Sequence, residues 1–222
     1  MRDPIGKFYA YLDRPIAYPV RFILVALCVP LLLAWSQPLW RISMEAPQYP
    51  DGLWMEIHVA KMTSGNDNQH LKEINTLNHY IGMQPIREED FAELGWMPFA
   101  IGALFLLTLR VAAIGNVRML IDLAVSSFYV LSFLGARFVY QLYVYGHNLD
   151  PKAPFKMEPF TPAIYGTKQI ANFTTHSFPQ IGTHLIGLFL LGVVAVTLGQ
   201  LISGRLAAVR RSLAPPPPSP GG

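Results

Sequence analysis

The run VRFILVALCVPLLLAWSQPLW, residues 20–40, decides the fold of this chain. It is long enough to cross the hydrocarbon core of a bilayer, which takes about 20 apolar residues of helix. Pro30 lies inside it, and proline is tolerated in a membrane helix. Three further apolar runs follow along the chain. We therefore predict an all-α membrane protein with four transmembrane helices, at residues 19–41, 95–114, 119–145 and 184–204.

The composition supports this class. The chain is 52% hydrophobic and 14% charged, whereas soluble domains carry about 25% charged residues. Cys28 is the single cysteine, so the sequence excludes an intramolecular disulfide and a cysteine-based metal cluster. The net charge of +3 comes mostly from residues at the ends of apolar runs, which argues against a nucleic-acid partner.

Lysine and arginine near the helix ends predict the orientation, because cytoplasmic segments are enriched in these residues. They gather before the first helix, between the second and third, and after the fourth: Arg2, Lys7, Arg14, Arg21, Arg110, Arg118, Arg205, Arg210 and Arg211. Both termini are thus expected inside and both long loops, residues 42–94 and 146–183, outside. Residues 1–18 are predicted to be an amphipathic lead at the inner surface and residues 205–222 a disordered cytoplasmic tail.

The two long loops are expected to form a small cap. In the first loop, Asp51 is a plausible N-cap for one short helix, and HLKEINTLNHYIG, residues 70–82, predicts a second that ends at Gly82. The second loop is rich in proline and aromatic residues. It is therefore predicted to be irregular but ordered, and packed on the first loop.

Histidine and methionine are concentrated in these loops, and both are copper ligands. Two H-x-x-x-M pairs occur, and on a helix residues four apart can converge on one ion. The candidate metal ligands are His58, Met62, His79, Met83, His147, Met157 and His176. The alternative is that these side chains serve packing and interface roles. Iron or zinc is also open, although methionine favours copper.

Motifs for catalysis are absent from the sequence: there is no Walker motif, G-x-S-x-G, C-x-x-C-H or H-E-x-x-H. This absence favours a protein without enzymatic activity over an enzyme and does not decide between them. An enzyme acting on lipids or quinones is the least favoured alternative.

Three strings carry a resemblance to a known family: EAPQYP at residues 45–50, INTLNHYIGM at 74–83 and KQIANFTTHSF at 168–178. They resemble strings in an uncharacterised family of small bacterial polytopic membrane proteins encoded beside nitrous-oxide-reductase maturation and copper-delivery genes. The resemblance implies copper supply, or electron transfer, to an extracytoplasmic copper enzyme such as nitrous oxide reductase. It also implies residence in the bacterial inner membrane, with the long loops facing the periplasm.

Two functions follow as hypotheses. The first is an accessory protein that binds or delivers copper at the outer face of the membrane. The second is a non-catalytic structural subunit of a respiratory or electron-transfer complex. In both, the partners are the lipid bilayer and a larger membrane or periplasmic protein complex.

Overall fold

The computed structural model describes residues 4–170 and 172–213. Four of its helices are long and apolar enough to cross a membrane, which confirms the prediction of a multi-pass membrane protein. The helices are α1 (Pro4–Leu12), α2 (Tyr18–Ser36), α3 (Gln69–Tyr80), the short η1 (Glu88–Asp90), α4 (Ala92–Ile114), α5 (Val117–His147) and α6 (Ile181–Leu213).

The prediction of an all-α fold is wrong, because the two long loops build a five-stranded antiparallel sheet. The strand order is β3-β2-β1-β5-β4, so the hairpin of the second loop extends the sheet of the first through the pairing of β1 with β5. The expected packing of the two loops on each other is thus confirmed, in the form of a shared sheet. The strands are β1 (Trp40–Ala46), β2 (Tyr49–Ile57), β3 (Met62–Ser64), β4 (Gly166–Ile170) and β5 (Phe173–Pro179).

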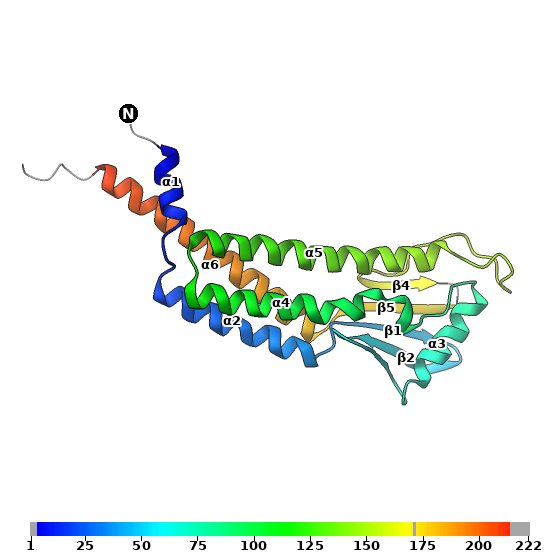
Figure 1. The fold of residues 1–222 in the computed structure, drawn as a ribbon. Helices are drawn as coiled ribbons and strands as arrows, with labels where there is room; N and C mark the ends of the chain where they lie inside the picture. The colour runs from blue at the N-terminus through cyan, green and yellow to red at the C-terminus, as the bar shows by residue number, and fades with distance from the viewer. Residues whose placement is uncertain (1–3, 171, 214–222) are drawn as a thin grey trace, which may run out of the picture.

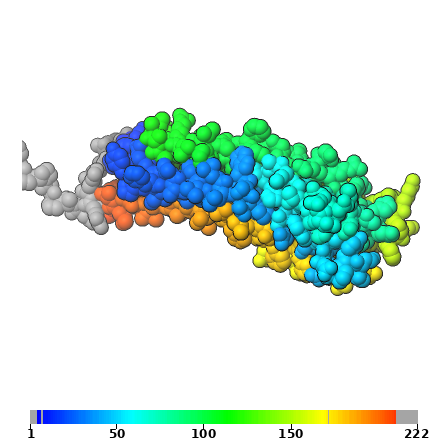
Figure 2. Space-filling model, turned by 90° about the horizontal axis from the view of Figure 1, so that it is seen from below, coloured from blue at the N-terminus to red at the C-terminus, as the bar shows by residue number. Residues whose placement is uncertain are grey.

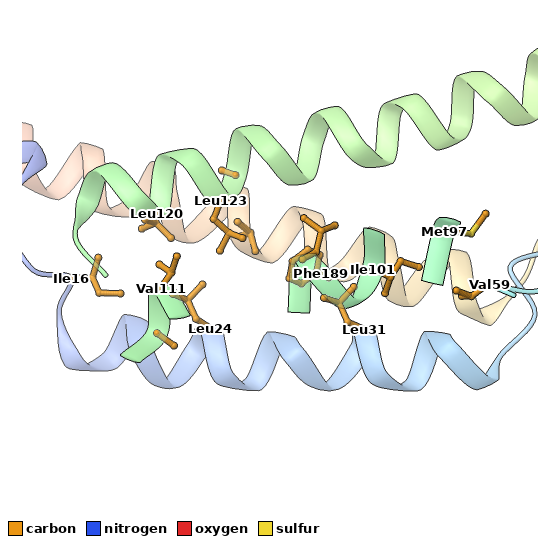
Figure 3. Packing of buried hydrophobic residues seen from close by; sticks show 14 residues of the cluster. Ile16, Leu24, Leu31, Val59, Met97, Ile101, Val111, Leu120, Leu123 and Phe189 are labelled. Atoms are coloured by element: carbon orange, nitrogen blue, oxygen red, sulfur yellow. The ribbon is translucent and has the colours of Figure 1, made fainter. Parts of the chain in front are cut away.

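The four long helices form a bundle in which α2 and α5 each contact both α4 and α6. Its core is mainly aliphatic. Figure 3 shows Leu31 of α2 facing Phe189 of α6 and Ile101 of α4, and Leu24 lies further along α2. These four side chains are at most 1% exposed. The rest of each helix surface carries exposed large hydrophobic residues, as expected of helices that face lipid.

The sheet stands at one end of the bundle and both described chain ends lie at the other (Figure 1). Both long loops therefore lie on the same side, as the pattern of basic residues requires. Seen from below, the sheet end continues directly from the bundle as one elongated body, and the loop between α5 and β4 projects at the far end (Figure 2). We call the sheet, α3 and this loop the cap.

Helix α5 joins the bundle to the cap. It has 31 residues, or about 46 Å of helix, which exceeds the ~30 Å hydrocarbon core of a bilayer. Figure 1 shows the excess running alongside the sheet, beyond the end of α2. There Phe138 packs against Trp40 of β1, with ring centroids 4.9 Å apart. One helix thus contributes to both the bundle core and the cap core.

Two further predictions concern the loop helix near Gly82 and the C-terminal tail. The predicted second loop helix is present as α3, and Gly82 follows its end with a φ of +81°, a conformation that glycine adopts without strain. Helix α6 continues to Leu213, into the stretch expected to be a disordered tail. The remainder of that tail, residues 214–222, lies outside the described residues.

Candidate functional site

The two faces of the sheet differ in chemistry. Ile42 of β1 is paired with Met55 on one side and Ser177 on the other, so these three side chains share the inner face, which packs under α3 and α5. Ser43 is paired with Trp54 and His176, which share the outer face. The inner face is apolar and buried, whereas the outer face carries charged groups and histidine.

A cavity of about 70 Å³ lies between the inner face of the sheet, α3 and the end of α5. Three thioethers line it, from Met44 of β1, Met55 of β2 and Met83 after α3. Met44 and Met55 are 4% and 2% exposed. Few polar side chains reach the lining: Asn78, Gln141, Tyr145, Thr175 and Ser177. Among the described residues, the cavity wall contains no carboxylate or lysine, so the cavity suits a neutral or soft, weakly hydrated occupant.

The first H-x-x-x-M pair does not lie on a helix. Residues 53–64 form the hairpin of β2 and β3, which replaces the predicted helix beginning near Asp51. Met62 is opposite Ile57 and packs in the buried core of the cap. His58 lies on the outer face, where its Nε2 is 3.0 Å from the hydroxyl of Thr63. The sheet therefore separates this histidine from its methionine.

The second pair is divided by the end of α3. His79 is exposed on the last turn of the helix. The backbone then turns at Gly82, and the amide of Met83 donates to the carbonyl of Asn78. Met83 consequently points back to the cavity while His79 faces away from the core.

The other predicted ligands occupy three separate places. His147 stacks on Tyr143 at the end of α5, with ring centroids 3.8 Å apart. Met157 packs at the border of the cap core. His176 lies on the outer face of the sheet, with Nδ1 2.7 Å from the Thr167 hydroxyl. Among the described residues, no group of three or more His, Cys, Asp or Glu could hold a metal ion.

The outer face carries a polar network centred on Glu56, which is 8% exposed. Arg41 donates to its Oε1 at 2.8 Å and lies over the ring of Trp54, 4.9 Å from the centroid. His58 Nε2 is 3.8 Å from its other oxygen. Burial lowers the pKa of His58 below its ordinary value, and the charge of Glu56 opposes this shift.

The lowered pKa of His58 predicts a pH dependence of the hairpin of β2 and β3. The folded state favours the neutral imidazole, so this contribution to stability is present above the unfolded pKa of about 6.5 and is lost as the pH falls. We expect amide hydrogen exchange in the hairpin, corrected for intrinsic rates, to be less protected at acidic than at neutral pH. The substitution His58→Gln should reduce this difference, while His79→Gln, at an exposed position, should leave it. An unchanged pH dependence in His58→Gln would contradict this account.

A polar recess adjoins the cavity at the end of α5. Its volume is about 360 Å³, and Gln141 and Tyr145 line both spaces. Arg87 and Asp90, from the segment that precedes α4, supply one charge of each sign. The neutral polar side chains of its wall are Gln84, Gln141, Tyr145 and Asn148.

An ion pair with a buried carboxylate lies where the cap meets the bundle. Glu93, in the first turn of α4, is 8% exposed and accepts a hydrogen bond from Arg137 of α5. Its second carboxylate oxygen is buried and has no hydrogen-bond partner among the described residues. Arg137 also lies over the ring of Tyr140, 5.4 Å from the centroid. The pair fixes α5 to α4 at the base of the cap.

No protein-family model, curated protein or solved structure matches this chain. The resemblance to a bacterial family linked to nitrous oxide reductase therefore stays a prediction. The class defined by the structure is a four-helix multi-pass membrane protein with an antiparallel sheet cap.

Met44 and Met55 line the cavity but were absent from the predicted ligand set. The sequence pattern that identifies them is the alternation of apolar and polar residues in ISMEA, 42–46, and LWMEI, 53–57. This alternation is typical of a strand with one buried face. It places both methionines on the buried side of neighbouring strands.

Proposed function

We propose that the protein is a non-enzymatic accessory protein that holds Cu(I) at the outer face of a bacterial inner membrane and supplies an extracytoplasmic copper enzyme. The ion is bound in the cavity of the cap by the thioethers of Met44, Met55 and Met83. This retains the copper function expected from the sequence and changes its ligand set, keeping only Met83.

The presence of three methionines in the lining of one small cavity carries the proposal. A volume of about 70 Å³ is below the ~150 Å³ of an apolar cavity that accepts benzene, so a bulky organic ligand does not fit. A single ion does. Thioethers select Cu(I), and a lining without carboxylates offers little compensation for the desolvation of a divalent cation.

The competing explanation is that the methionines only fill space, since their flexible side chains pack well in irregular cores. Substitution by leucine separates the two explanations because it keeps the volume and removes the sulfur, at a cost usually below about 1.5 kcal/mol. Met62 provides a matched control. It is buried in the same core but does not line the cavity.

The test is a competition with a chromophoric Cu(I) chelator, performed on protein purified in mild detergent under reducing conditions. We expect about one Cu(I) per chain, and an affinity lower by at least about 100-fold in the triple variant Met44→Leu/Met55→Leu/Met83→Leu. Met62→Leu should bind as the unsubstituted protein does. The three thioethers supply the inner coordination shell in this proposal, so their joint removal leaves no soft ligand in the cavity.

Two results would overturn the assignment. Loss of copper in His79→Ala/His176→Ala, with full binding in the triple leucine variant, would return the site to the histidines. Absence of stoichiometric copper from the unsubstituted protein would reject the copper function. The non-catalytic subunit of a respiratory or electron-transfer complex would then be the leading hypothesis.

A further inference from the structure

From the length of α5, we expect the polar recess at its end to lie at the height of the lipid headgroups. Helix α5 begins at Val117 on the opposite side, and about 20 residues of helix cross the hydrocarbon core. Counted from Val117, the core is expected to end near Arg137. Gln141 and Tyr145 lie one and two turns further on, or about 6 and 12 Å. The headgroup zone adds about 5–8 Å on each side of the core, so the recess begins within it.

The charges in the recess define its ligand. Arg87 precedes the three-residue helix η1 and Asp90 is its last residue, and both side chains are exposed and line the recess. Within the described part of the chain, neither takes part in an ion pair. The hydroxyl of Tyr145, which lines the recess, is buried and has no hydrogen-bond partner among the described residues. One cation, one anion and several neutral donors and acceptors complement a zwitterion.

We propose that this recess binds the phosphoethanolamine headgroup of a phospholipid in the outer leaflet. The guanidinium of Arg87 binds the phosphate, for which its planar donors are well suited. The carboxylate of Asp90 binds the ammonium, which also needs neutral acceptors. The amide oxygens of Gln84 and Asn148 in the recess wall provide them. The acyl chains stay in the bilayer, because the adjoining cavity is too small to admit them.

The chemistry distinguishes this headgroup from others. Phosphatidylglycerol presents the phosphate without an ammonium and leaves Asp90 facing an anionic lipid. Phosphatidylcholine presents a quaternary ammonium that cannot donate hydrogen bonds to Asp90 or the amides. We therefore expect selectivity for the primary ammonium. The proposal is independent of the copper function, since Arg87 and Asp90 do not line the methionine cavity.

The experiment is native mass spectrometry of delipidated, metal-free protein in detergent. The probes are phosphatidylethanolamine, phosphatidylglycerol and phosphatidylcholine with identical acyl chains. We expect the first to bind about tenfold more tightly than the other two. Arg87→Gln should weaken its binding by about the same factor. Asp90→Asn should remove the preference over phosphatidylglycerol. Because both positions are exposed, the variants are expected to keep the fold, which their unfolding curves will verify.

Arg118→Gln is the matched control. Arg118 pairs with Asp13 at the opposite end of α5, so this variant should bind phosphatidylethanolamine as the unsubstituted protein does. Equal binding of the three lipids, or a full preference in Asp90→Asn, would overturn the proposal. Soluble glycerophosphoethanolamine tests the source of the group. It should fail to displace the lipid at a similar concentration, and effective displacement would overturn the assignment to a membrane lipid.

Discussion

Arg137→Ala is expected to lower the free energy of unfolding by about 3 kcal/mol, because it leaves the carboxylate of Glu93 buried without its partner. Glu93 is 8% exposed, and Arg137 is the residue that donates to it. A buried charge that loses its partner keeps its desolvation penalty, which exceeds the net contribution of the intact pair. The measurement is chemical or thermal unfolding of this variant and the parent in the same detergent.

Two variants make this result specific. The double variant Arg137→Ala/Glu93→Gln removes the charge that would be unpaired, so it should recover much of the loss. Arg118 lies on the same helix as Arg137 and pairs with Asp13. The side chains of Arg118 and Asp13 are 48% and 61% exposed, and Arg118→Ala breaks this pair. A surface pair of this kind contributes about 0–1 kcal/mol. An equal loss in Arg137→Ala and Arg118→Ala would show that burial does not determine the effect.

The bundle could be predicted from the sequence because its signal is local. A membrane helix satisfies its own backbone hydrogen bonds, so an apolar run of sufficient length is enough to identify it. The runs around Leu24 and Ile101 are of this kind, and both residues are in the bundle core. Nothing distant along the chain is needed to reach this conclusion.

The sheet could not be predicted from local sequence because its decisive contacts are distant along the chain. Strand β1 pairs with β5, and this places Ser43 opposite His176. No local pattern specifies such a pairing. In addition, Met55, His58 and Met62 have a spacing that also fits one face of a helix. The alternation of Leu53, Met55 and Ile57 is the competing signal, and the structure follows it.

The candidate site was predictable as a region but not as a set of atoms. The abundance of histidine and methionine marked the two loops that form the cap. The prediction of paired ligands depended on helical geometry, which His58 and Met62 do not have because their segment forms a hairpin. Burial of Met44 and Met55 on adjacent strands depends on strand register, and register is fixed by the whole sheet.

Gly146→Ala is the second substitution with a large expected effect. Gly146 lies in the last turn of α5 and is buried. A Cβ there would overlap the carbonyl oxygen of Phe160 and lie 2.7 Å from Cδ of Pro162. The amide of Phe160 also donates to the carbonyl of Gly146 at 2.9 Å. The obstacle is backbone, which cannot rotate away as a side chain can. We therefore expect a loss of about 2–3 kcal/mol.

The same substitution at Gly135 is the control, since a Cβ at this position on α5 meets no atom within 4 Å. Replacing a helical glycine there with alanine should stabilise the helix by about 0.5–1 kcal/mol. Unfolding curves show whether each variant is more or less stable than the parent. Limited proteolysis of the loop at residues 148–165 shows whether the loop is the part that loosens. That loop should become more sensitive in Gly146→Ala and stay as resistant as in the parent in Gly135→Ala. Equal resistance in both variants would mean that the contact between Gly146 and Phe160 does not hold the loop on α5. The geometry around Gly146 predicts the opposite, because the loop reaches the helix there through backbone atoms at a distance that only glycine permits.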